Sequence, residues 1–157
     1  MGARREGRES AMQFLFLRDL GGADDPDALQ AFFKIRNTSP SARSFCKQLI
    51  EGVVKIQDKI DSLIQNCCHN YQLNRIAPVD RNILRVAIYE LLANPEIPPA
   101  VAINEAIEIA KKYGTNESAR FVNGILDCCR KSIVSQTIPS EQSSSHILIP
   151  TDESHPS

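Results

Sequence analysis

The fold class follows from one periodic segment of the sequence, Pro78-Val79-Asp80-Arg81-Asn82-Ile83-Leu84-Arg85-Val86-Ala87-Ile88-Tyr89-Glu90-Leu91-Leu92. Its apolar side chains recur at spacings of three and four residues, for example at Ile83, Ala87 and Leu91. Such spacing places them on one face of an α-helix. Proline suits the first helical turn, and Asn94-Pro95 closes the segment. We therefore predict an amphipathic helix here.

The same helical period recurs on both sides of this segment. Towards the C-terminus it predicts a helix over residues 100–113, which stops at Gly114, and another that begins after Asn116. Towards the N-terminus other signals predict helices: residues 4–20 end at the helix stop Gly21-Gly22, and residues 28–35 follow the acids and proline of Asp24-Asp25-Pro26-Asp27. The longest periodic block, residues 45–67, predicts a single helix of about seven turns.

No segment alternates with the period of two that a half-buried strand requires. The sequence therefore predicts an all-α fold, a compact bundle of six to seven helices joined by short loops. Residues 132–157 hold eight serines and three prolines, and their one apolar cluster is Ile147-Leu148-Ile149. We predict a helical domain over residues 1–131 and a disordered, serine-rich tail over residues 132–157.

The formal net charge of −1 conceals an uneven distribution. The predicted tail has three acidic residues and no Lys or Arg, so the predicted domain holds 18 basic and 16 acidic residues. This domain is only weakly basic. Bulk electrostatics alone therefore does not identify a nucleic-acid partner.

The sequence predicts a cytoplasmic protein. No run of 18 apolar residues is present, and the charged start Met1–Glu6 is not followed by the apolar region of a signal peptide. The five cysteines are an odd number and include two vicinal pairs, which is not the pattern of a secreted disulfide framework.

Motifs for catalysis are absent from the sequence: it has no Gly-rich phosphate loop and no nucleophile elbow. A zinc site can be imagined from Cys67, Cys68, His69, Cys128 and Cys129. Structural zinc sites use cysteines two to four residues apart, because adjacent side chains diverge. We therefore predict no enzyme activity, no metal and no cofactor, and we interpret the cysteines as small core or boundary residues.

Arg4, Arg5 and Arg8 are the best polar candidates for a binding site. On a helix Arg4 and Arg8 lie one turn apart, and Arg5 is about 100° round from Arg4. Guanidinium groups in this arrangement can meet phosphates or stack on unpaired bases. The alternative is a solvated first turn whose charge Glu6 and Glu9 partly neutralise.

Several strings of the sequence together resemble a known family. They are Arg4-Arg5-Glu6-Gly7-Arg8-Glu9-Ser10-Ala11-Met12-Gln13, Ala77 to Leu91, Val101-Ala102-Ile103-Asn104-Glu105-Ala106-Ile107-Glu108-Ile109-Ala110-Lys111-Lys112-Tyr113-Gly114, and Ser118-Ala119-Arg120-Phe121-Val122-Asn123-Gly124-Ile125-Leu126-Asp127. This pattern resembles the NusB family of bacterial transcription antitermination factors. The resemblance extends from Ala3 to about Lys131.

The resemblance implies an RNA-binding protein without catalysis. Members of the family pair with NusE, a small-subunit ribosomal protein, bind single-stranded boxA RNA of nascent ribosomal transcripts, and join an antiterminating RNA polymerase. It further implies RNA contacts for Arg4, Arg5 and Arg8, and a stacking or supporting role for Phe121, which as an apolar helix residue also fits the core. Glu6 stands where the family often has another Arg, so we expect RNA binding that depends more on the partner.

The resemblance also implies a protein partner on the C-terminal helices. Asp80 and Glu117 are acids that could meet a basic ribosomal protein, although each also suits the start of a helix. Some members form homodimers, which the sequence neither favours nor excludes. Two alternatives remain open: a helical adaptor that binds only proteins, and a domain related to those fused to RNA cytosine methyltransferases.

Overall fold

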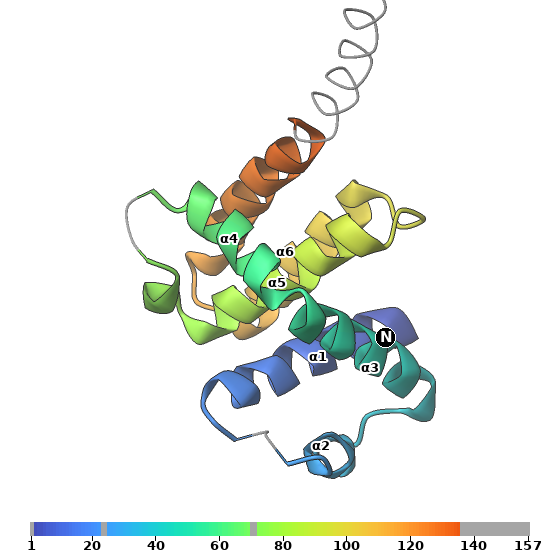
Figure 1. The fold of residues 1–157 in the computed structure, drawn as a ribbon. Helices are drawn as coiled ribbons and strands as arrows, with labels where there is room; N and C mark the ends of the chain where they lie inside the picture. The colour runs from blue at the N-terminus through green and yellow to red at the C-terminus, as the bar shows by residue number, and fades with distance from the viewer. Residues whose placement is uncertain (1, 23–24, 70–71, 136–157) are drawn as a thin grey trace, which may run out of the picture.

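The computed structural model describes residues 2–22, 25–69 and 72–135, and every regular element in these ranges is helical (Figure 1). The elements are α1 (Ala3–Asp19), α2 (Ala28–Arg36), α3 (Pro40–Lys55), α4 (Gln57–Cys67), a 3₁₀ turn η1 (Leu73–Arg75), α5 (Pro78–Ala93), α6 (Pro99–Tyr113) and a last helix over residues 118–135. The predicted all-α bundle is confirmed.

Helix α5 is the central element of the bundle. It packs against α1, α3, α4 and α6. In Figure 1, α1, α2 and α3 form the lower part of the molecule, and α4, α6 and the last helix lie above them. Because neighbours surround α5, its polar residues Asn82, Arg85 and Glu90 are buried together with its apolar face. Buried polar groups require partners, so these three residues determine much of the geometry that follows.

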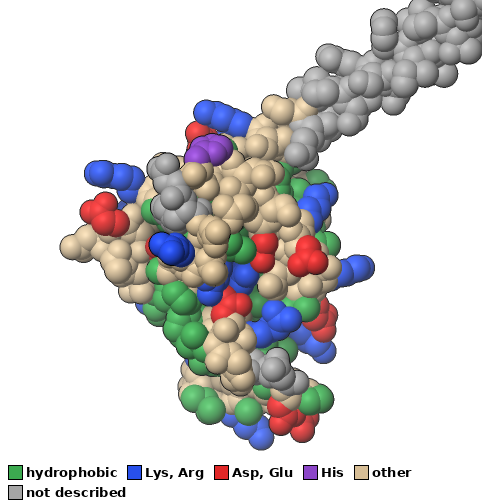
Figure 2. Space-filling view, turned by 60° about the vertical axis from the view of Figure 1, so that its left-hand side comes forward, with side chains coloured by type: hydrophobic (Ala, Val, Ile, Leu, Met, Phe, Trp, Pro, Cys, Tyr) green, Lys and Arg blue, Asp and Glu red, His purple; other side chains and the backbone are tan. Residues whose placement is uncertain are grey.

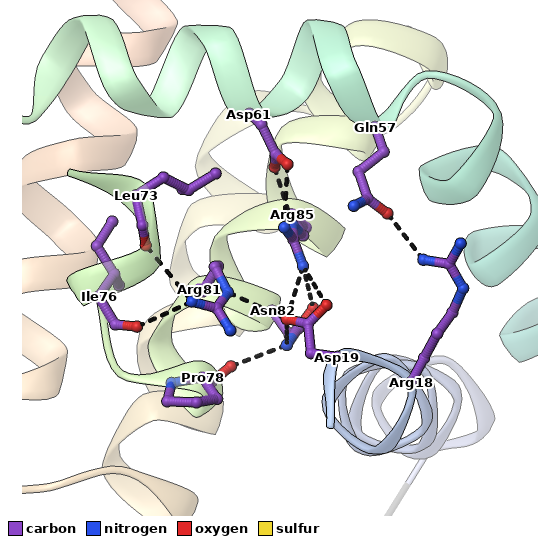
Figure 3. Close-up of polar contacts among 10 residues, drawn as sticks. All are labelled: Arg18, Asp19, Gln57, Asp61, Leu73, Ile76, Pro78, Arg81, Asn82 and Arg85. Atoms are coloured by element: carbon purple, nitrogen blue, oxygen red, sulfur yellow. Dashed lines mark hydrogen bonds and ion pairs between the residues drawn. The ribbon is translucent and has the colours of Figure 1, made fainter. Parts of the chain in front are cut away.

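A polar network joins the C-terminal end of α1 to α4 and α5 (Figure 3). Asp19 accepts hydrogen bonds from Arg81 Nε and Asn82 Nδ2, each at 3.0 Å, and from Arg85 Nη1 at 2.8 Å. On its other side Arg85 donates to both carboxylate oxygens of Asp61, at 2.9 and 3.0 Å. Arg85 therefore links α1 and α4 across α5.

The prediction of one long helix over residues 45–67 is wrong. The chain leaves helical geometry at Ile56, where φ is −118° and ψ is 27°, and this residue separates α3 from α4. The break allows α3 to pack on α1 while α4 packs on α5. Leu49, Val53 and Ile60 are all fully buried, so both helices direct the same apolar stripe into the core. The apolar stripe continues through the break at Ile56, so the spacing of the apolar residues does not reveal the break.

The interpretation of all five cysteines as free core residues is wrong for two of them. Cys67, at the end of α4, forms a disulfide with Cys128 of the last helix. Their Cα atoms are 6.0 Å apart, because the two helices lie side by side. Cys46, Cys68 and Cys129 are buried and free, as the sequence predicted. Within the described ranges no three His, Cys, Asp or Glu residues are grouped to hold a metal ion.

The last helix continues to residue 135, past the domain boundary predicted at Lys131. Residues 136–157, which make up most of the predicted tail, lie outside the described residues. Among the helices of the described ranges, none combines the length and apolar character that crossing a membrane requires.

Candidate nucleic-acid interface

The N-terminal end of α1 carries the predicted arginine site. The helix begins at Ala3 after extended backbone at Gly2, and Glu6 N–H donates to Gly2 O at 3.0 Å. Gly7 lies against α3, since a Cβ atom there would come within 2.9 Å of the Phe45 ring and 3.3 Å of the Ala42 carbonyl. Glycine therefore permits the close approach that places Phe45 beside the arginines.

Arg4 is exposed, and its guanidinium lies over the ring of Phe45, 4.8 Å from the ring centroid. A guanidinium stacked on an aromatic ring keeps its N–H edges available while the ring restricts its movement. No carboxylate pairs with Arg4 among the described residues. Of the three predicted arginines it is the one most available to an outside anion.

Arg5 is half exposed and forms a bidentate ion pair with Glu105 of α6. Its Nε donates to Oε1 at 2.9 Å and its Nη2 donates to Oε2 at 2.7 Å. The hydrogen bonds to Glu105 and the negative charge of that carboxylate raise the pKa of Arg5 above its usual range. Arg5 is therefore a surface cation whose Nε–Nη2 edge is already occupied.

Arg8 differs from the expected position, because its guanidinium is inside the protein. The side chain is 5% exposed and binds Glu90 through two hydrogen bonds, Nε to Oε1 at 2.8 Å and Nη2 to Oε2 at 2.9 Å. Phe45 covers it, with its ring centroid 5.4 Å from the guanidinium carbon. The structure thus separates the predicted cluster into two surface arginines and one buried ion pair.

Glu6, expected to weaken RNA binding, turns towards α3. It accepts hydrogen bonds from Ser39 N–H at 2.9 Å and Ser39 Oγ at 2.7 Å, at the start of that helix. These hydrogen bonds, which outweigh burial, lower the pKa of Glu6 below its usual range. Glu6 thus caps the N-terminus of α3. The partial positive charge of that helix end compensates part of the negative charge of Glu6, so this charge acts less strongly on the arginine surface.

Glu9 is an interaction centre that the sequence did not reveal. It is 2% exposed and accepts hydrogen bonds from Tyr113 Oη at 2.9 Å and Lys112 Nζ at 3.1 Å. Arg36 of α2 lies 3.4 Å away on the same carboxylate. Glu9 therefore joins α1 to α2 and α6. Two of its partners, Lys112 and Tyr113, are more than a hundred residues away in the sequence, so no local pattern indicates this role.

The other predicted site residues meet in a second place. Asp80, Glu117 and Phe121 line an open groove of about 450 Å³ together with Arg75, Ile76 and Ala77. Oδ1 of Asp80 is the only buried side-chain oxygen or nitrogen in the described ranges without a hydrogen-bond partner. Phe121 is half-buried and packs against the core. The groove therefore places the RNA candidate Phe121 beside the two candidates for protein contact.

The groove and the surface arginines are separated along α5. Glu90, beside Arg8, and Asp80, in the groove, are ten residues apart on this helix, or about 15 Å by helical rise. A single RNA strand that touched both Arg4 and Phe121 would have to run along the molecule. In Figure 2 basic and acidic side chains are interleaved across the face in view, without one dominant basic patch.

A sequence model described as the NusB family matches residues 5–131. The chain belongs to the NusB family. The match covers most of α1, the central α5 and the helices of the groove, so Arg5 and the groove lie within the family's region, whereas Arg4 directly precedes it. It ends before residues 132–135 of the last helix.

Individual members of the NusB family are similar over most of their length. The transcription antitermination protein NusB of Myxococcus xanthus is 44% identical over 131 residues, which cover 81% of this chain and 94% of that protein. The protein of the same name from Geobacter sulfurreducens is 45% identical over 128 residues, with 81% and 93% covered.

Solved structures of the NusB family have the same fold. NusB of T. maritima superposes with a TM-score of 0.72 at 40% identity, covering 82% of this chain and 90% of that one. A crystal structure of the antitermination factors NusB and NusE in complex with double-stranded RNA contains a chain with a TM-score of 0.74 at 26% identity, covering 83% and 97%.

Proposed function

We propose that this chain is a transcription antitermination factor that binds boxA-type single-stranded RNA of nascent ribosomal transcripts. It does so with a NusE-type ribosomal protein, joins the elongating RNA polymerase of a bacterial cytoplasm, and performs no catalysis. The observation that carries the proposal is the pair of surface arginines, Arg4 stacked on Phe45 and Arg5 beside it, in a chain of the NusB family.

The arginines of the structure suit a modest RNA contact. Arg4 presents a positive charge without a paired carboxylate, and Arg5 beside it is paired with Glu105 at the surface. The charge of Arg8 is neutralised inside the protein by Glu90. Each phosphate contact releases counterions and adds to affinity at low salt, and two contacts give a weak complex. The partner protein therefore supplies further contacts. Base edges and stacking provide sequence selectivity, which phosphate contacts lack.

Replacing Arg4 and Arg5 together with alanine is expected to weaken binding of a boxA RNA about tenfold at low salt. The slope of log affinity against log salt concentration should fall by about 1.4, because two phosphate contacts to a single strand are lost. Fluorescence anisotropy with boxA, scrambled and duplex RNA, with and without the NusE-type protein, measures both quantities. Arg8 is left intact because its loss would also destabilise the fold.

The matched control is Lys55→Ala with Lys59→Ala, which removes the same charge from exposed positions on α3 and α4. It should change the affinity much less. An unchanged salt slope in the arginine variant would remove Arg4 and Arg5 as the contact. Equal affinity for boxA and scrambled RNA with the partner present would leave only the protein-binding adaptor.

The groove around Asp80 is the proposed docking site of the NusE-type protein. A buried carboxylate oxygen without a partner favours an incoming donor, and Glu117 at the rim adds a second negative charge for a basic protein. Asp80→Asn with Glu117→Gln should weaken binding of that protein about tenfold or more. Titration calorimetry measures this directly.

The control for the groove is Glu51→Gln with Glu96→Gln, two exposed acids on α3 and in the loop after α5. This pair should leave partner binding nearly unchanged. If both double variants lose the same affinity, then overall charge rather than the groove attracts the partner.

A further inference from the structure

The ion pair between Arg5 and Glu105 differs from its buried neighbour in exposure. The Arg5 side chain is 45% exposed and that of Glu105 is 17% exposed, whereas Arg8 and Glu90 are 5% and 1% exposed. A bidentate pair with one half-exposed member exchanges partners more readily, because water and ions reach the arginine. A buried pair does not, because separating its charges leaves one of them unpaired in the interior.

The carboxylate of Glu105 occupies Arg5 in the way that a phosphate would. Both oxygens accept from the Nε and Nη2 groups, and this fork geometry is common to carboxylate and phosphate recognition by arginine. An RNA phosphate that uses this edge must therefore displace Glu105. Arg4 has no such competitor among the described acids, so it meets RNA without any exchange.

We propose that Glu105 is an intramolecular competitor of the RNA backbone, which lowers RNA affinity and requires a phosphate to exchange for it on Arg5. This inference rests on the proposed RNA-binding function. Glu105 is a positioning residue that acts through Arg5, and its carboxylate determines how much of the arginine surface is free before RNA arrives.

The structure also provides a place for the displaced carboxylate. Oε1 of Glu105 lies 3.7 Å from Nη1 of Arg8, so Glu105 keeps a cationic neighbour when Arg5 turns towards RNA. Arg8 meanwhile retains its two hydrogen bonds to Glu90. The exchange therefore leaves no isolated charge behind, and it moves only the side chain that is already half exposed.

Glu105→Gln tests the competition. The amide keeps the size of the side chain but removes the charge, and RNA affinity is expected to rise about two- to fivefold. The salt slope should stay close to that of the wild type, because Arg5 contacts the same phosphate in both complexes and only the cost of displacing Glu105 is removed. The control is Glu108→Gln, which removes an equal charge one turn along α6, where Glu108 pairs with Lys111 rather than Arg5. Both variants are also made in an Arg5→Gln background.

Anisotropy with a boxA RNA separates the outcomes, and thermal unfolding verifies that each variant is folded. A gain in Glu105→Gln that exceeds the gain in Glu108→Gln, and that disappears in the Arg5→Gln background, supports the competition. Equal gains in both variants, or weaker binding in Glu105→Gln, overturn it while the proposed function stands. If the wild-type protein does not distinguish boxA from scrambled RNA with its partner present, the proposed function fails instead.

Discussion

Replacing Arg8 with alanine is expected to lower the free energy of unfolding by about 4 kcal/mol. The substitution leaves the carboxylate of Glu90, which is 1% exposed, without its bidentate partner. It also removes the guanidinium that packs against the Phe45 ring. Urea denaturation followed by circular dichroism at pH 7 measures the loss. The loss should greatly exceed that of Arg5→Ala, since Arg5 lies at the surface.

A double variant tests whether the unpaired carboxylate of Glu90 accounts for this loss. Arg8→Met with Glu90→Leu replaces both charged groups with apolar side chains of similar length, and a buried ion pair replaced in this way often costs little stability. We expect the double variant to recover most of what Arg8→Ala loses. If Arg8→Ala costs less than about 1 kcal/mol, the pair is not desolvated as the structure indicates.

Replacing Asp19 with alanine is expected to cost about 3 kcal/mol of stability at pH 7. Asp19 is the acceptor shared by Arg81, Asn82 and Arg85, and its loss leaves three donors turned towards a space without an anion (Figure 3). Arg85 keeps Asp61, which limits the damage. The control is Asp127→Ala, which breaks an exposed pair with Lys131 and should cost at most about 0.5 kcal/mol.

The effect of Asp19 should depend on pH in a defined direction. Burial alone would raise its pKa, but the hydrogen bond from Asn82 and the charge of Arg85 outweigh burial and lower the pKa below 3.8. A carboxyl group with a lowered pKa stabilises the folded state above its unfolded pKa, and this contribution is lost as pH falls through the folded value. The difference between wild type and Asp19→Asn should therefore be constant from pH 7 to about 5 and shrink below pH 4. A constant difference down to pH 2 would contradict this assignment.

Helical periodicity predicted most of the secondary structure because each helix carries its own apolar stripe. It failed at Ile56, since a stripe that stays continuous across a bend has the same spacing as a straight helix. It also could not pair Cys67 with Cys128, because the contact between α4 and the last helix is set by packing of the whole bundle.

In the candidate site, too, only features that depend on nearby residues could be predicted from the sequence. One signal for the position of Arg8 was present in the sequence: Ala11, Met12 and Leu15 lie three, four and seven residues after it, and all three are buried. Arg8 therefore extends the apolar face of α1. Its partner Glu90 lies 82 residues away, and nothing in the local pattern links the two. Asp80, Glu117 and Phe121 likewise line one groove only in the folded chain, although Asp80 is more than thirty residues from the other two in the sequence.

The charged contacts of α1 affect how the chain folds while it is being synthesised. Helix α1 is synthesised before α5 and α6, so the partner of Arg8 is made 82 residues later and the partner of Arg5 is made 100 residues later. A ribosome that has made only α1 to α4 therefore carries a helix in which Arg5 and Arg8 still lack Glu105 and Glu90. The packing of α1 on α3 can form at that stage, but the two ion pairs form only when α5 and α6 emerge, so the native contacts of this helix are completed late.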